Sequence, residues 1–276
     1  QPQKGKSWSF GADYRSTFLP GLNLSATFWH NEIEGGITSP VPSLAVNSPA
    51  LATRLKFFPA GATPAQIAAL QLNLATTSTL PANIYFVYNY QQGNVLNLWV
   101  EGVDVSASYK FDSQFGSFDL ATAVAYETKF DQQVGNGTAI FSVLNTTGYN
   151  TTFPSIKLNA RTSLGWKKGP VSATAYWNYT GSYKNWGGAA VNPLVKNALG
   201  IPTGAGGDNV DALNTFDAHV AYSFEGEGIT SGMQIFADAT NLLDKKPSFY
   251  NNAQGYDTYS GNPIGRIPSI GVRKKW

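Results

Sequence analysis

The feature that most constrains the fold is an alternation of apolar and polar residues over unusually long segments. Such a segment becomes a strand with one apolar and one polar face, because successive side chains point to opposite sides. Nine segments show the pattern, at roughly 6–15, 21–33, 95–111, 117–130, 153–167, 170–182, 211–225, 229–241 and 264–276. Ordinary strands run about 5–6 residues, whereas a tilted strand needs about 9–11 residues to cross a bilayer. The segment lengths therefore favour strands that span a membrane.

Aromatic residues gather at both ends of the apolar faces. One group contains Tyr14, Tyr109, Phe111, Phe118, Trp166, Phe224 and Trp276, and the other contains Phe28, Trp99, Phe130, Trp177, Tyr179 and Phe216. Two aromatic girdles around an apolar band about 25 Å tall are typical of outer-membrane barrels. The opposite faces carry charged residues such as Asp104, Glu127, Lys129 and Arg161. We expect these charges to face a hydrated lumen.

The connections between the nine segments alternate between short and long. Short ones fall at 16–20, 112–116, 168–169 and 226–228, and long ones at 34–94, 131–152, 183–210 and 242–263. Short periplasmic turns and long extracellular loops are the rule in transmembrane barrels. The sequence thus predicts an all-β, antiparallel transmembrane β-barrel. A soluble antiparallel sheet with one wet face also alternates, so a secreted β protein that binds carbohydrate stays an alternative.

Composition excludes several other classes. Charged residues make up 13% of the chain, about half the ~25% usual in soluble domains. The net charge of +2 gives no indication of the basic patch that a nucleic-acid-binding protein needs. With no Cys and only two distant His, we expect no metal site and no thiol nucleophile. His219 and Asp217 share a strand face, but no catalytic constellation surrounds them, so we expect neither an enzyme nor a cofactor.

The strand count predicts a part of a larger barrel. With long loops outside, the first strand runs inward and the last ends on the periplasmic side. Complete bacterial barrels have even strand numbers, and an open sheet edge is not tolerated in lipid. We therefore expect residues 1–276 to form one portion of a bigger barrel.

The last 36 residues carry a recognisable pattern. It consists of Asn241, Leu242, Leu243 and Asp244, followed by the pair Gly265 and Arg266. This stretch resembles the end of TonB-dependent outer-membrane receptors, and the segments 2–14 and 100–111 are similar to recurrent strands of that family. The terminal Trp276, with Ile270 and Val272 at alternate positions, resembles the signal that the barrel-assembly machinery reads.

The resemblance implies a 22-stranded barrel in the bacterial outer membrane, of which this chain would be the last nine strands. It implies an N-terminal plug domain and a TonB box, both absent from residues 1–276, and energy from the TonB–ExbB–ExbD complex. Membrane lipid and lipopolysaccharide would surround the barrel. The implied function is active uptake of a scarce nutrient of the siderophore, cobalamin or carbohydrate type. A passive, porin-like barrel is the alternative.

Candidate ligand contacts lie in the outer loops. Aromatic rings among Asn and Gly suit stacking and hydrogen bonding to a small molecule or an oligosaccharide; the candidates are Tyr183, Trp186, Phe249, Tyr250, Tyr256 and Tyr259. Packing of the loops on themselves is the competing explanation for these rings. In the longest loop, Thr63 and Pro64 predict the start of a short helix, with Ile67, Leu70 and Leu74 on one face.

Overall fold

The computed structural model describes residues 2–40, 42–71, 80–81, 83–147, 155–187, 195–197, 200, 202–203 and 206–275. Nine long strands form one antiparallel sheet in the order β1-β2-β5-β6-β9-β10-β13-β14-β15. Their bounds are β1 Lys4–Arg15, β2 Leu22–Thr38, β5 Gly93–Ser113, β6 Gly116–Val134, β9 Leu158–Lys168, β10 Val171–Thr180, β13 Leu213–Ser223, β14 Met233–Thr240 and β15 Ile267–Lys274. The nine predicted strands and their antiparallel pairing are confirmed.

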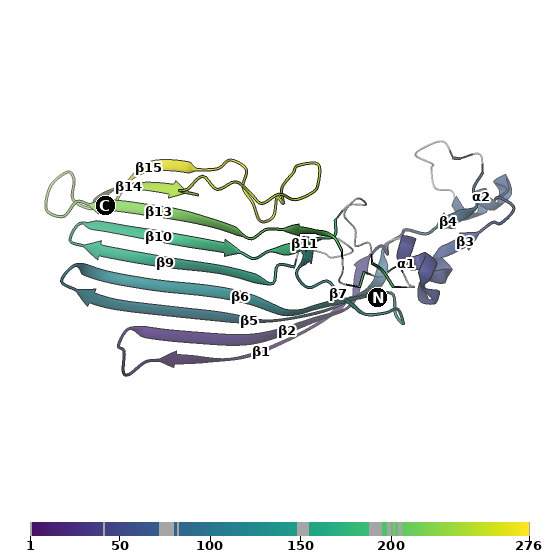
Figure 1. The fold of residues 1–276 in the computed structure, drawn as a ribbon, viewed down its shortest axis with the longest axis horizontal. Helices are drawn as coiled ribbons and strands as arrows, with labels where there is room; N and C mark the ends of the chain where they lie inside the picture. Colours follow the sequence, from purple (N-terminus) through teal and green to yellow (C-terminus); the bar gives the residue numbers. More distant parts are fainter. Residues whose placement is uncertain are drawn as a thin grey trace.

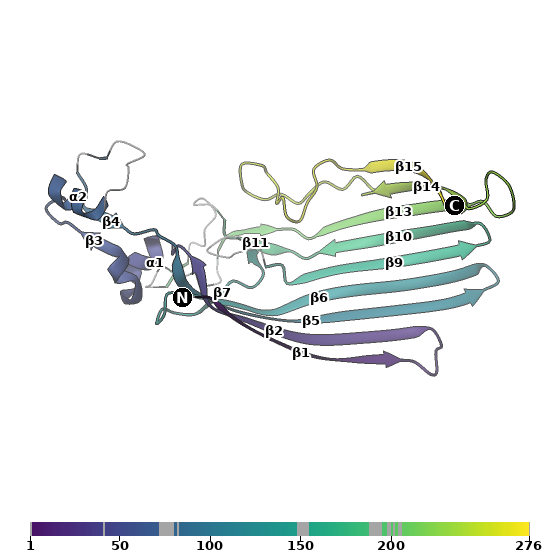
Figure 2. The same ribbon diagram turned by 180° about the vertical axis from the view of Figure 1, so that it is seen from behind.

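The sheet is open and curved, with β1 and β15 at its two edges (Figures 1 and 2). Short turns gather at one end of the strands and long connections at the other, as the sequence predicts (Figure 1). We call the second end the mouth. Within the described ranges, no helix is long and apolar enough to cross a membrane.

Small elements fill the mouth. An arm made of β3 Leu55–Phe57, β4 Phe86–Tyr88 and the helix α2 Pro64–Gln71 projects beyond the sheet (Figure 1). The other mouth elements are α1 Pro42–Asn47, the 3₁₀ helix η1 Pro49–Arg54, β7 Phe141–Ser142, β8 Thr146–Thr147, β11 Tyr183–Asn185 and β12 Asp208–Val210. The sequence analysis anticipates only α2 among them.

Helix α2 begins where the sequence predicts. The Thr63 hydroxyl accepts a hydrogen bond from the Gln66 N–H at 3.3 Å, and the Gln66 side chain accepts one from the Thr63 N–H at 2.8 Å. This reciprocal pair is a capping box, which satisfies two backbone donors that a helix start leaves free. Leu74, expected on the same helix face as Ile67, lies outside the described residues.

The two faces of the sheet differ as the alternation predicts. On what we call the outer face, Val105 lies opposite Val124, which lies opposite Ala160; on the inner face, Asp104 lies opposite Ala125. Leu158 and Val124 are partly exposed and Ala175 is exposed. The apolar stripe is therefore not buried under a second layer, which argues against a soluble sandwich.

The apolar stripe has the height of a bilayer core. On β5, the outer face runs from the charged Glu101 to the aromatic Phe111, ten residues further along the strand. At about 3.4 Å per residue and a tilt of about 40°, that distance is about 26 Å along the barrel axis. Within the stripe, the hydroxyls of Thr122 and Thr162 bond each other at 2.9 Å, which satisfies two polar groups that lipid could not.

A bulge reverses the faces of the mouth end of β6. Glu101 pairs with Lys129 but the next residue, Gly102, pairs with Glu127, so Thr128 is an extra residue without an opposite partner. An extra residue shifts every later side chain to the other face. The expectation that Lys129 faces the lumen and Phe130 the outer girdle is therefore wrong. Lys129 lies on the outer face, 3.5 Å from Glu101, and Phe130 is fully buried on the inner side.

Phe130 belongs to a compact core under the mouth. Its buried members are Ala45, Leu51, Leu96, Leu98, Phe130, Val134, Phe141, Val143 and Trp186. They come from the long strands β5 and β6, from α1, η1 and β7, and from two loops. Burial of these side chains stabilises the projecting ends of β5 and β6, which extend beyond the apolar stripe.

Candidate ligand-binding and transport surface

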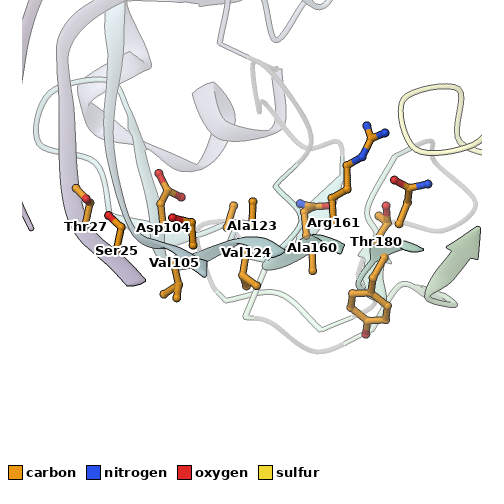
Figure 3. A pocket seen from close by; sticks show the side chains of 14 residues that line it. Ser25, Thr27, Asp104, Val105, Ala123, Val124, Ala160, Arg161 and Thr180 are labelled. Atoms are coloured by element: carbon orange, nitrogen blue, oxygen red, sulfur yellow. The ribbon is translucent and has the colours of Figure 1, made fainter. Parts of the chain in front are cut away.

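The inner face of the sheet is a polar wall. Figure 3 shows Ser25, Thr27, Asp104 and Arg161 on one side of the strands, and Val105, Val124 and Ala160 on the other. The side chains of Asp104 and Arg161 are exposed. The wall is thus polar and accessible, which is what a water-filled lumen requires.

Charges on the inner wall are held by neighbours on adjacent strands. The Arg161 guanidinium lies 4.6 Å from the ring centroid of Tyr176, within cation–π range. The Asn178 amide donates to the Asp217 carboxylate at 2.8 Å. His219 Nδ1 lies 2.6 Å from Asp238 Oδ1, and both side chains are about one-third exposed. These contacts order the wall and leave it open to solutes.

A second site lies at the mouth, where three loops are fastened together. Strands β12, β11 and β8 form a three-stranded sheet in that order. The buried Tyr183 hydroxyl donates to Asp257 Oδ2 at 2.6 Å, and the Ser260 hydroxyl donates to the same oxygen at 2.9 Å. Burial, together with the hydrogen bond to Asp257, raises the pKa of the Tyr183 phenol well above its ordinary value. Tyr183 therefore stays neutral and works as a clamp between β11 and the last loop.

Two further contacts connect the last loop to the same small sheet. The hydroxyls of Thr147 and Tyr250 lie 2.8 Å apart, and the Asn185 amide donates to the Asn251 carbonyl at 3.2 Å. Burial raises the pKa of the Tyr250 phenol as well. The mouth is therefore a pre-ordered surface and not a set of independent loops, at least in the residues that the structure describes.

The candidate ligand contacts separate into two groups. Tyr183 and Trp186 are buried, and Tyr250 and Tyr256 are partly exposed. Phe249 and Tyr259 are among the most exposed aromatic residues of the chain. For Tyr183 and Trp186, the geometry matches loop packing, the competing explanation. Ligand contact stays a prediction, and Phe249 and Tyr259 are the side chains best placed for it.

The residues of the family pattern build the loop between β14 and β15. Asn241 and Asp244 have positive φ angles of 51° and 55°, a conformation that Asn and Asp tolerate better than most residues. The Asn241 side chain bonds both backbone groups of Lys245, at 2.8 and 2.9 Å. Leu242, which follows Asn241, donates its N–H to the Phe216 carbonyl at 2.6 Å, and the Leu243 side chain is exposed.

At the far end of the same loop, Asp244 lies against both Gly265 and Arg266. Asp244 Oδ1 accepts the Arg266 N–H at 2.9 Å. A Cβ on Gly265 would come within 2.4 Å of that carboxylate oxygen, and Gly265 has a φ of 78°. Only glycine fits there without strain. The pattern therefore closes the base of the last loop.

The residues of the expected assembly signal lie on the last strand. Ile270 and Val272 are exposed on the outer face, opposite Ala237 and Ile235. Trp276 lies outside the described residues. Recognition by the assembly machinery stays a prediction.

Sequence reasoning did not find Asp257, because nothing in its local spacing marks it as the partner of Tyr183. It also did not find the ion pair between Lys129 and Glu101 on the outer face, because the position of Lys129 depends on the bulge in β6. Among the described side chains, no group of three His, Asp or Glu residues could hold a metal ion.

Solved structures support the fold. The chain resembles the outer membrane transporter YddB from Escherichia coli, with a TM-score of 0.58 and 12% identity over 100% of this chain and 33% of that chain. It resembles the siderophore receptor PirA from Acinetobacter baumannii, with a TM-score of 0.57 and 15% identity over 99% and 32%. The FrpB iron transporter from Neisseria meningitidis gives 0.56 and 12% identity over 98% and 31%.

The chain spans about a third of the length of these transporters. No curated protein matches its sequence. A family model described as TonB dependent receptor-like, beta-barrel, matches residues 1–242. This match covers most of the chain and includes eight of the nine long strands, and it agrees with the open antiparallel sheet and its two unlike faces. The chain therefore belongs to the TonB-dependent receptors, a family of bacterial outer-membrane transporters and not of enzymes, and forms part of their β-barrel.

Proposed function

We propose that this chain is the C-terminal part of a receptor that takes up a scarce nutrient across the outer membrane with energy supplied through TonB. The observation that carries the proposal is the combination of a polar inner wall with a pre-ordered mouth on a barrel of this family. A plug domain elsewhere in the receptor would contact the wall near Arg161 and His219.

The last loop of the mouth offers both rings and charges. Two of the long loops carry few charges, but residues 183–210 and 242–263 carry Lys184, Lys196, Asp208, Asp244, Lys245, Lys246 and Asp257. Phe249 and Tyr259 offer exposed rings beside amides such as Asn252. Rings with neighbouring amides bind ligands through stacking and hydrogen bonds. A carbohydrate or an organic chelate, which offers surfaces for stacking and polar groups for hydrogen bonds, fits the exposed rings of this loop.

Uptake by cells tests the energised mechanism. Cells that express the receptor would be supplied with radiolabelled oligosaccharides, cobalamin or ferric siderophores, with and without TonB. We expect uptake of one ligand class that stops when TonB is deleted or the proton gradient is collapsed. Uptake that continues unchanged in both conditions would instead establish a passive, porin-like channel.

Binding to the mouth is a separate measurement. The purified receptor would be titrated with the ligand taken up, as wild type and as Tyr259→Ala and Phe249→Ala. We expect each substitution to weaken binding about tenfold, because one stacked aromatic contact contributes about 0.5–1.5 kcal/mol beyond its buried area. Gln254→Ala, an exposed residue of the same loop, is the matched control. Equal affinities for all four proteins would remove both rings from the proposed site.

A further inference from the structure

Large apolar side chains occupy the tips of three of the four short turns. Phe18 between β1 and β2 is 93% exposed, Phe115 between β5 and β6 is 65% exposed, and Ile229 between β13 and β14 is 88% exposed. Turn tips that face water normally carry Gly, Asn, Asp or Ser. The fourth turn, between β9 and β10, follows that rule with Gly169. Three exposed apolar tips at one end of a barrel therefore need an explanation.

Two of these turns are fastened to the outer face by side chains of the neighbouring strand. Trp166 Nε1 donates to the Phe115 carbonyl at 2.8 Å, and Lys168 Nζ donates to the Gln114 carbonyl at 3.2 Å. Lys274 Nζ donates to the Ile229 carbonyl at 2.6 Å. Trp166 and Lys168 share the outer face with Leu164, and Lys274 shares it with Val272, since they alternate along their strands. The contacts therefore place both turns beside the lipid-facing surface.

The fastened turns continue the inner aromatic girdle. Tyr109, Phe111 and Phe118 stack on the outer face directly above the β5–β6 turn, with ring centroids 5.0 and 5.1 Å apart. Aromatic rings with lysine ammonium groups beside them are the composition that proteins place at the level of lipid headgroups. The apolar side chains of the turns lie further toward the periplasm than the rings of this girdle.

The arrangement of the tips fits a flat surface. The β5–β6 and β13–β14 turns are separated by the β9–β10 turn, which has no apolar tip. The three turns lie at the same end of the sheet (Figure 2). A protein partner would require one contiguous patch, whereas a lipid leaflet contacts every outward-facing group at the same depth.

We infer that the short turns form an interfacial anchor, in which Phe115, Ile229 and Phe18 insert among the headgroups of the periplasmic phospholipid leaflet. Lys168 and Lys274 lie at the level of the phosphates and hold the turn carbonyls. The anchor fixes the height of the barrel in the membrane. It is independent of nutrient uptake and of TonB.

Spin labelling of the receptor measures the depth of the turn. The described chain and its full sequence have no Cys, so Gln114→Cys offers a label beside Phe115. The receptor would be reconstituted in bilayers of phosphatidylethanolamine and phosphatidylglycerol. Collisions with oxygen, which concentrates in lipid, would be compared with collisions with a water-soluble nickel chelate. The label would be read in the wild-type, Phe115→Leu and Phe115→Ser backgrounds.

The anchor predicts that the label at 114 favours oxygen in the wild type and in Phe115→Leu, and becomes accessible to the chelate in Phe115→Ser. A label at Gln254→Cys in the mouth should favour the chelate in all three backgrounds. The inference is overturned if the label at 114 is as open to the chelate as the label at 254. It is also overturned if serine and leucine give the same result, or if the label is shielded only after periplasmic protein is added. Should the serine variant fail to assemble, the comparison of labels 114 and 254 in the wild type decides alone.

Discussion

An arginine substitution should lower the free energy of unfolding much more on the outer face of the sheet than on the inner face. Val124 lies in the apolar stripe, between Val105 on β5 and Ala160 on β9. It is four residues below the level of Glu101, which corresponds to about 10 Å of depth. In Val124→Arg, the guanidinium must either stay in lipid or bend over that distance to water.

The expected cost follows from the depth. Arginine on the lipid face of a barrel costs about 2–4 kcal/mol near the midplane, which lowers the ratio of folded to unfolded receptor about 30- to 700-fold. The matched control is Ala125→Arg, on the inner face directly opposite Asp104. There the guanidinium is hydrated and gains a cross-strand partner, so the free energy of unfolding should stay within about 1 kcal/mol of wild type. Ala123 is a poorer control because its β9 partner is Arg161.

The assay is reversible unfolding of the receptor in phospholipid vesicles with guanidinium chloride, followed by tryptophan fluorescence, with outer-membrane yield in cells as a second readout. Val124→Arg should lower the midpoint and the yield, while Ala125→Arg should match wild type in both. Equal losses for the two variants would refute the assignment of faces, and so would a greater loss for Ala125→Arg.

Three further results are expected. Thr122→Val should destabilise the receptor by about 1–3 kcal/mol, because it leaves the Thr162 hydroxyl without its partner in lipid, whereas the double replacement with Thr162→Val should recover most of the loss in the same unfolding assay. The pKa of Tyr183 is higher in the folded protein than its ordinary value near 10, so stability should fall as the pH rises above about 10, where only the unfolded phenol ionises. Tyr183→Phe should be less stable at neutral pH and show a smaller alkaline decline, since Tyr250 and Tyr88, whose pKa values are also raised, keep their share of it; an identical pH profile would contradict the clamp. Deletion of Thr128 should leave Phe130 in the mouth core, because removing the extra residue keeps Glu127 facing inward, Lys129 facing outward and Phe130 facing inward without a bulge. Protease should therefore cleave the mouth loops of this variant at the wild-type rate, and faster cleavage would contradict the assignment of Thr128 as the extra residue.

The membrane-spanning part of the wall is determined by local pattern. Each strand alternates with a period of two, and the turns that join them are short, so neighbours in sequence become neighbours in the sheet. This is why Val105, Val124 and Ala160 lie on one face as the sequence predicts. The same locality fixed the start of α2, whose capping box involves only Thr63 and its neighbours.

The mouth was decided by tertiary structure. Tyr183 and Asp257 are 74 residues apart, and no pattern near either one predicts their hydrogen bond. The sequence places Trp186 among the loop aromatics that could contact a ligand. In the structure it is buried, because residues from α1, η1, β5 and β6 meet beside it. Burial in loops depends on contacts between distant segments, which a local pattern does not encode.

The bulge at Thr128 marks the boundary between what the local sequence determines and what only the tertiary structure determines. Alternation read from residues 117–130 places Phe130 in the outer girdle, and it does so correctly as long as the period of two is unbroken. One extra residue in β6 shifts Lys129 to the outer face and Phe130 into the mouth core. A bulge is fixed by the pairing with β5 and not by the composition of β6. The sequence by itself therefore determined the strands, their order and the lipid-facing stripe, whereas only the packed structure determined where that stripe ends and how the mouth is built.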